Sequence, residues 1–92
     1  MYTITLLPDA EESFKKLDGA IQKRIAHKID WLAKQADTMI HHPLTSLPDD
    51  LRGLCRMRIG DYRIMYWVYT EDKHIKIYAI EHRSKDYRSI KR

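Results

Sequence analysis

The stretch CRMRIGDYRIMYWV, residues 55–68, decides the fold of this chain. Arginines alternate with apolar residues up to Gly60 and Asp61, and a second apolar-rich run follows. A two-residue turn that begins with glycine, placed between two such runs, is typical of a β-hairpin with a type II′ turn. We therefore predict strands over 54–59 and 62–69.

Because side chains alternate along a strand, the predicted hairpin has one apolar face and one basic face. On the basic face Arg58 lies opposite Arg63, and Arg56 lies opposite Met65. Like charges opposite each other destabilise a sheet, so their presence favours a bound anion, and planar guanidinium groups grip phosphate well. The alternative is that these arginines only keep an exposed sheet face soluble. The apolar face is predicted to carry helices, and its members are Cys55, Met57, Ile59, Tyr62, Ile64, Tyr66 and Val68.

Outward from the hairpin, the chain supplies a first strand, two helices, a loop and a last strand. Alternating β-formers predict strands over 2–7 and 74–82. Pro8 opens a short helix, and isoleucines and leucines spaced three and four apart predict a long helix over 20–39. Residues 40–53 contain two prolines and several turn formers, so we predict a loop there.

These elements predict one domain, residues 1–92, of the α+β class. Its sheet is small, twisted and mostly antiparallel, with one N-terminal strand and three C-terminal strands. An α-helical hairpin packs on one face of the sheet, and a short helical tail ends the chain. The 43% of hydrophobic and 33% of charged residues are ordinary for a globular protein.

Composition also indicates the compartment. No apolar run approaches the roughly 20 residues that span a bilayer, and the N-terminus does not resemble a signal peptide. A lone Cys55 suits a reducing compartment, so we expect a cytoplasmic protein with no membrane partner. His41 and His42 are adjacent, and adjacent side chains seldom share one metal ion, so we expect neither a metal site nor a cofactor.

Charge is distributed unevenly along the chain. Residues 1–51 hold six Lys or Arg and eight Asp or Glu, a net charge of −2, whereas residues 52–92 hold eleven and five, a net charge of +6. A basic half of this kind attracts nucleic acid or an acidic protein.

The last strand extends the basic face. If Tyr69 pairs with His74, then His82 falls on the arginine face, and Arg83 and Tyr87 follow directly. We therefore predict an open sheet with helices on one face. The other face is predicted to be lined by Arg56, Arg58, Arg63, His82, Arg83 and Tyr87.

With these residues in place, the chain resembles the RelE/ParE superfamily of bacterial and archaeal toxins over essentially its whole length. Two motifs carry the resemblance, LRGLCRMRIGDYRIMYWV at 51–68 and IYAIEHRSKDY at 77–87. The ending HRSKDY is similar to the RelE branch, whose members cut messenger RNA in the ribosomal A site. The resemblance implies a toxin that inhibits translation, with the 70S ribosome and mRNA as partners. It also implies a RelB-like antitoxin, whose acidic segment wraps the basic face in a hetero-oligomer.

The resemblance implies roles for single residues in a metal-independent attack of a ribose 2′-hydroxyl on its neighbouring phosphate. Arg63 and Arg83 would stabilise the transition state, and Tyr87 would orient a base or share in proton transfer. The best-known RelE-type enzyme has lysines where this chain has Arg56 and Arg58, and arginine is a poor base. His82 is the natural substitute, with Glu81 and Tyr87 as weaker candidates. The expected catalytic residues are Arg56, Arg58, Arg63, His82, Arg83 and Tyr87. The expected RNA contacts are Arg52, Arg56, Arg58, Lys85 and Arg88.

Two other functions fit the same pattern. A ParE-like toxin shares the fold but inhibits DNA gyrase by binding it, without nuclease chemistry. A plain nucleic-acid-binding module would need only basic strands interleaved with Met65 and Trp67. The arginines clustered with Tyr87 favour the nuclease.

Overall fold

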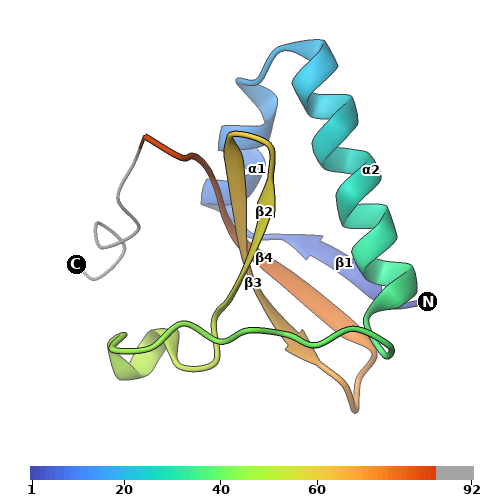
Figure 1. Cartoon of the computed structure of the whole chain (residues 1–92), viewed down its shortest axis with the longest axis vertical. Coiled ribbons are helices and arrows are strands. Elements are labelled where there is room, and N and C mark those ends of the chain that lie inside the picture. Colours follow the sequence, from blue (N-terminus) through green and yellow to red (C-terminus); the bar gives the residue numbers. More distant parts are fainter. Residues whose placement is uncertain (85–92) are drawn as a thin grey trace.

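In the computed structural model, which describes residues 1–84, the chain has the predicted α+β fold (Figure 1). The three C-terminal strands begin and end within one residue of the predicted bounds, while the predicted helical tail lies outside the described residues. The elements are β1 (Thr3–Leu6), α1 (Pro8–Lys15), α2 (Gly19–Gln35), a 3₁₀ turn η1 (Asp49–Leu51), β2 (Cys55–Ile59), β3 (Tyr62–Tyr69) and β4 (His74–His82).

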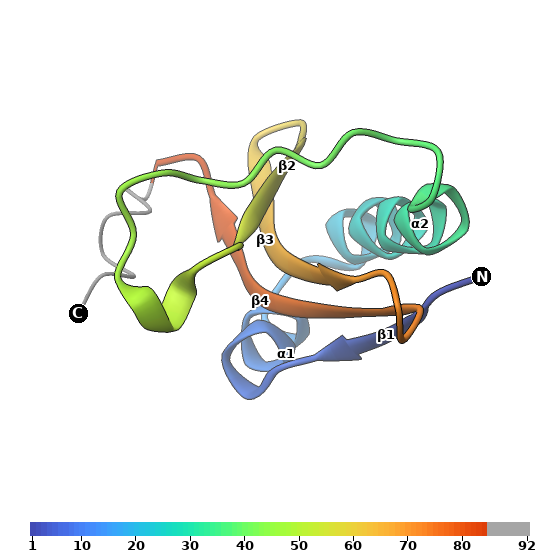
Figure 2. The ribbon, with the colours of Figure 1, turned by 90° about the horizontal axis from the view of Figure 1, so that it is seen from below.

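The strands form one sheet in the order β1-β4-β3-β2. Strand β1 pairs with β4 in parallel, and the other two pairs are antiparallel. Figure 2 shows β1 at one edge of the twisted sheet and β2 at the other, with the chain between α2 and β2 passing along the β2 edge. The hairpin with its arginines therefore lies at an edge of the sheet, next to that connecting chain.

The core lies between the helices and the apolar face of the sheet. The predicted stripe on α2 is buried at Ile25, Ile29 and Leu32, and Ala10 of α1 belongs to the same cluster. The sheet contributes the predicted alternating residues of the hairpin, such as Ile64.

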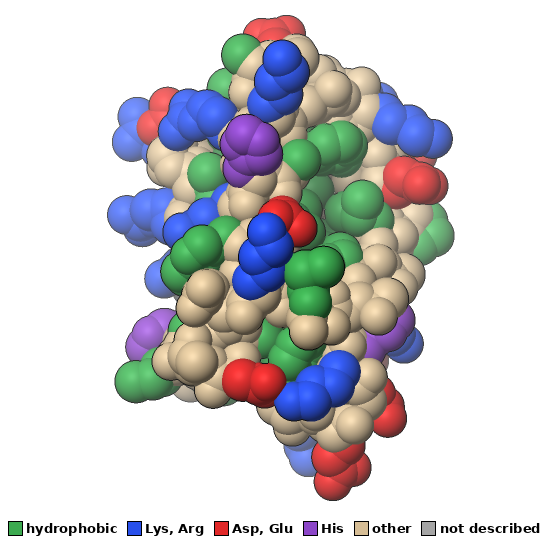
Figure 3. All heavy atoms as spheres, turned by 90° about the vertical axis from the view of Figure 1, so that its right-hand side faces the viewer, with side chains coloured by type: hydrophobic (Ala, Val, Ile, Leu, Met, Phe, Trp, Pro, Cys, Tyr) green, Lys and Arg blue, Asp and Glu red, His purple; other side chains and the backbone are tan. Residues whose placement is uncertain are grey.

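On the outer side of α2, acidic and basic side chains are interspersed (Figure 3). Among residues 1–84, no helix is both long and apolar enough to cross a bilayer.

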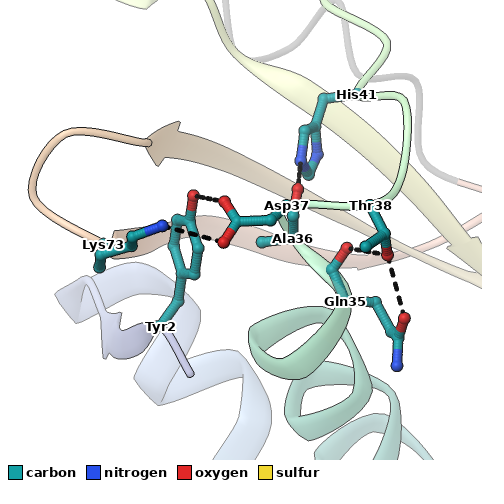
Figure 4. Close-up of polar contacts among 7 residues, drawn as sticks. All are labelled: Tyr2, Gln35, Ala36, Asp37, Thr38, His41 and Lys73. Atoms are coloured by element: carbon teal, nitrogen blue, oxygen red, sulfur yellow. Dashed lines mark hydrogen bonds and ion pairs between the residues drawn. The ribbon is translucent and has the colours of Figure 1, made fainter.

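Polar contacts fix the end of α2 to the sheet (Figure 4). The Tyr2 hydroxyl, from the chain before β1, donates to Asp37 Oδ1 at 2.6 Å. Lys73, in the turn between β3 and β4, donates to Asp37 Oδ2 at 2.9 Å. One carboxylate just after α2 thus contacts the residues that directly precede β1 and β4, at the end of the parallel pair where both strands begin. These two hydrogen bonds hold the pKa of Asp37 below its ordinary value, and the bond from Tyr2 has the larger effect.

His41 fixes the start of the long loop. One ring nitrogen lies 2.8 Å from the Tyr66 hydroxyl, and the other lies 2.9 Å from the Ala36 carbonyl. Burial raises the pKa of Tyr66, so its hydroxyl keeps its proton and donates to His41 Nδ1. The imidazole therefore donates from Nε2 to Ala36. His41 connects the end of α2 to the centre of β3, which makes it a structural residue.

The prediction that the face opposite the helices is open is wrong in part, because the loop after α2 folds over this face. Met65 on β3 is fully buried, and so is Leu54 at the end of the loop, although neither belongs to the core cluster under the helices. Trp67 donates from Nε1 to the Arg52 carbonyl at 2.9 Å, and its ring meets that of Tyr78 edge-on. Apolar side chains at alternate positions provide burial for the loop over the middle of this face. Arg58 at the hairpin end of the face stays exposed, as do Tyr69 and Lys76 at its other end.

Candidate functional site

The turn at Gly60 and Asp61 fixes the register of the β2–β3 hairpin. The backbone φ is +54° at Gly60 and is not positive at Asp61, as the predicted type II′ turn requires. Arg58 pairs with Arg63, and Arg56 lies two positions before Arg58 on the same face. The predicted row of arginines is therefore confirmed.

A hollow of about 170 Å³ lies at this end of the sheet, and four of its seven lining residues are arginines. Arg56 and Arg58 come from β2, Arg63 comes from β3, and Arg83 comes from the chain just after β4. The turn residues and Tyr62 complete the wall. Guanidinium groups gathered around one concave site create a positive potential and match the geometry of phosphate oxygens. We call this site the arginine hollow.

Asp61 positions Arg83 at the arginine hollow. The Arg83 backbone N–H donates to the Asp61 carbonyl at 2.6 Å, and Arg83 Nε lies 3.4 Å from Asp61 Oδ1. Both side chains are mostly exposed, so this ion pair adds little to stability. Its consequence is geometric, because it brings the end of β4 to the hairpin turn. The sequence pattern indicates a turn at Asp61 but does not indicate this contact with Arg83.

A β-bulge in β4 overturns the prediction that His82 shares the arginine face. Tyr66 pairs with Ile77, but the preceding Met65 pairs with Ala79, so one residue of β4 is extra. Because side chains alternate along a strand, one extra residue exchanges the two faces for everything that follows. The predicted pairing of Tyr69 with His74 is correct. The assignment of β4 side chains to the two faces of the sheet that follows from this pairing holds only as far as the bulge.

Beyond the bulge, Glu81 and His82 have exchanged places relative to the prediction. Glu81 pairs with Arg63, whereas His82 pairs with Tyr62, and the two rings meet edge-on at 5.1 Å. His82 Nδ1 accepts a hydrogen bond from the Ser84 backbone N–H at 3.2 Å and lies 3.0 Å from Ser84 Oγ. The neutral ring therefore carries its proton on Nε2, and Nδ1 is already engaged as an acceptor.

The other predicted RNA contacts are Arg52, Lys85 and Arg88, and of these the structure describes Arg52. The Arg52 guanidinium pairs with Asp49 of η1 at 3.0 Å, and Arg52 is not among the residues that line the hollow. Lys85, Tyr87 and Arg88 lie outside the described residues.

Two features near the hollow were missed by sequence reasoning. A second hollow of about 270 Å³ is lined by Arg56, Arg58 and residues 42–44 of the loop, and we call it the loop hollow. On the other side of the turn, Arg24 of α2 reaches Gly60, since its Nη2 lies 2.6 Å from the position that a Cβ would occupy there. Both contacts join segments distant in sequence, and no local pattern reports them.

No set of three His, Cys, Asp or Glu side chains within residues 1–84 is grouped so that it could hold a metal ion. The site is instead built from cationic donors, which suit a phosphodiester as ligand.

The family comparison covers nearly the whole chain. Residues 4–87 match the family described as the ParE toxin of type II toxin-antitoxin system, parDE. A search among curated protein sequences gives no significant match.

Solved structures share the fold. A chain of the archaeal RelE–RelB complex from Pyrococcus horikoshii is 27% identical with a TM-score of 0.70, over 92% of this chain and 98% of that one. A chain of the YoeB–YefM toxin–antitoxin complex from Staphylococcus aureus is 28% identical with a TM-score of 0.62, over 89% and 97%. A chain of the RelBE2 complex from Mycobacterium tuberculosis, at 24% identity and a TM-score of 0.72 over 89% and 98%, supports the fold alone.

Proposed function

The chain belongs to the ParE toxin family of type II toxin–antitoxin systems, and from the geometry of its site we propose that it is a ribosome-dependent endoribonuclease that cuts messenger RNA in the A site. The observation that supports this proposal is the arginine hollow, in which four guanidinium groups surround a space suited to a phosphate. A toxin that acts only by binding a protein has no need for such a concentration of phosphate-binding groups.

In the proposed reaction the ribose 2′-oxygen attacks the neighbouring phosphorus, and the bond from phosphorus to the 5′-oxygen breaks. The products are a 2′,3′-cyclic phosphate and a 5′-hydroxyl. A base takes the proton from the 2′-hydroxyl, and an acid gives one to the leaving 5′-oxygen. Negative charge grows on the phosphorane oxygens, and Arg63 and Arg83 stabilise it while Arg56 and Arg58 hold the RNA backbone. This chemistry needs no metal ion.

We assign the proton acceptor to Glu81 in preference to His82. Glu81 lies opposite Arg63 on the arginine face, and a carboxylate can accept a proton where a guanidinium cannot. Neutral His82 offers an N–H at Nε2, because its Nδ1 accepts from Ser84. His82 instead orients the chain that leads to Tyr87, for which we keep the role of orienting a base or sharing in proton transfer.

We infer that an antitoxin holds the toxin inactive in the cytoplasm. Two of the similar structures are complexes of RelE with RelB and of YoeB with YefM. An antitoxin of this kind, with an acidic segment laid over the arginine hollow, would form a hetero-oligomer and compete with RNA for the same cations.

A second candidate is a toxin that binds and inhibits DNA gyrase, and the family match to ParE favours it. The test is to induce the protein and map new 5′ ends on translated messages by primer extension. Cuts placed by codon are expected in the wild type and in Lys23→Ala, which removes an exposed cation of α2. Arg63→Ala and Arg83→Ala should lower cleavage by about a hundredfold or more. Intact messages with altered DNA supercoiling would establish the gyrase candidate instead.

A second experiment tests the assignment of the base by comparing the variants Glu81→Gln and His82→Gln. Both variants keep a hydrogen-bonding side chain of similar size. We expect cleavage on programmed ribosomes to fall about a hundredfold in Glu81→Gln and to be largely kept in His82→Gln. The reverse order of activities would return the role of base to His82.

A further inference from the structure

The arginine hollow and the loop hollow share part of their lining, which comes from β2. Arg56 and Arg58 line both sites, so the two hollows are adjacent parts of one cationic surface. Strand β2 is the edge strand of the sheet, which leaves its outer side open to the loop. An extended polyanion held at the arginine hollow by one phosphate can therefore continue across β2 into the loop hollow.

The loop hollow differs from the arginine hollow in its chemistry. Its far wall consists of His42, Pro43 and Leu44, which are an imidazole ring, a pyrrolidine ring and an aliphatic side chain. His42 and Pro43 are exposed, and Leu44 is half-buried. A wall of flat and apolar groups facing two arginines matches a nucleotide, whose base stacks and whose phosphate is anionic.

The wall is held in place by the rest of the protein. Pro43 forms a β-bridge with Cys55, and the Leu44 N–H donates to the Leu54 carbonyl at 2.8 Å. The preceding His41 is hydrogen-bonded on both ring nitrogens, as described above. The backbone of residues 42–44 is thus anchored at both ends, next to the start of β2.

We propose that the loop hollow is a subsite for the RNA nucleotide next to the one whose phosphate lies in the arginine hollow. The base of that nucleotide stacks on His42 and packs against Pro43 and Leu44, while Arg56 and Arg58 contact its phosphate. This inference rests on the proposed function, because it extends the same RNA strand by one unit.

The test compares His42→Ala with His27→Ala, which removes another exposed histidine, on α2 and outside both hollows. The probe is a 70S ribosome programmed with a message whose A-site codon carries 2′-deoxyriboses, which cannot attack the phosphate. The dissociation constant is measured for each variant, with unprogrammed ribosomes as the baseline. We expect His42→Ala to weaken message-dependent binding about tenfold, in line with the loss of one base stack, and His27→Ala to leave it unchanged.

The outcomes separate this inference from the proposed function. If His42→Ala binds like the wild type while Arg58→Ala loses affinity, the subsite is wrong and the arginine hollow stands. If neither variant changes message-dependent binding, both the subsite and the proposed function are wrong. A change confined to the affinity for an acidic antitoxin segment would also overturn the RNA subsite and identify the loop hollow as a protein contact.

Discussion

Arg58 and Arg63 lie directly opposite each other on the antiparallel β2–β3 pair, where two like charges oppose folding. We expect Arg58→Thr, which keeps a β-forming residue at this exposed position, to raise the free energy of unfolding by about 0.5 kcal/mol at low salt. The same variant should bind RNA less well. Urea denaturation at low and at high salt measures the effect, which should shrink as salt screens the repulsion.

The control for this experiment is Arg52→Thr, because Arg52 has an acidic partner in Asp49 and no arginine opposite it. It should show no gain. A loss of stability in Arg58→Thr at low salt would mean that the paired arginines do not repel each other appreciably.

Gly60 is needed for the geometry of the hairpin turn. Its φ of +54° is costly for a residue with a Cβ, so Gly60→Ala should lower the free energy of unfolding by about 1 to 2 kcal/mol. The nearby atom is the end of the Arg24 side chain, which can move away. Gly19→Ala is the matched control, since a Cβ there meets nothing within 4 Å and alanine favours the helix. Thermal denaturation of both variants measures the two changes in stability. Equal losses of stability in Gly60→Ala and Gly19→Ala would show that the turn does not need a glycine.

The hydrogen bond between His41 and Tyr66 predicts a measurable coupling energy. His41→Ala leaves the hydroxyl of a fully buried tyrosine without this partner, which should cost about 1 to 3 kcal/mol. In a Tyr66→Phe background no hydroxyl is left unpaired, so the same substitution should cost less. A double-mutant cycle by urea denaturation gives the difference, and strictly additive effects would show that this hydrogen bond does not contribute to stability.

Asp37 predicts an acid-sensitive component of stability. Its pKa is lowered from the ordinary value of 3.8 by the hydrogen bonds from Tyr2 and Lys73. A group whose pKa is lower in the folded state stabilises the fold fully above its unfolded pKa and loses that effect as the pH falls through the folded value. The wild type should therefore melt higher than Asp37→Asn at pH 7, and the gap should close below about pH 4.

The control for Asp37 is Asp30→Asn, which breaks an exposed ion pair with Lys34 on α2. That change should lower the free energy of unfolding at pH 7 by no more than about 0.5 kcal/mol. If Asp37→Asn had as small an effect at pH 7, the contact that joins α2 to the starts of β1 and β4 would be of little energetic importance.

The fold was predictable because its determinants are local. Gly60 and Asp61 set the hairpin register, and the spacing of Ile25, Ile29 and Leu32 defines the buried side of α2. These patterns depend on the turn type and on the helical repeat, both of which are visible in a short window of sequence. The covering of Met65 by the loop was not predictable in this way, since it depends on a contact between distant segments.

The candidate site was predictable where it depends on the hairpin and not where it depends on the path of β4. Arg58 and Arg63 follow from the turn, and their pairing is as predicted. The displacement of His82 by the bulge has one trace in the sequence, which the prediction did not use: the step from Ile77 to Ile80 is three residues and breaks the alternation of the strand. The contact of Arg83 with Asp61 and the position of His42 beside β2 arise only from the tertiary fold.

The bulge in β4 also limits how functional roles can be transferred between relatives by alignment. The residue opposite Met65 is Ala79 and the one opposite Tyr66 is Ile77, so Tyr78 is the inserted position. Two toxins with the same letters at their C-terminal motif will present opposite side chains to the substrate if only one of them carries this insertion. Residues in the same column of such an alignment share ancestry, but their side chains can lie on opposite faces of the sheet. Strand geometry must therefore be compared before a catalytic residue is assigned by its place in the motif.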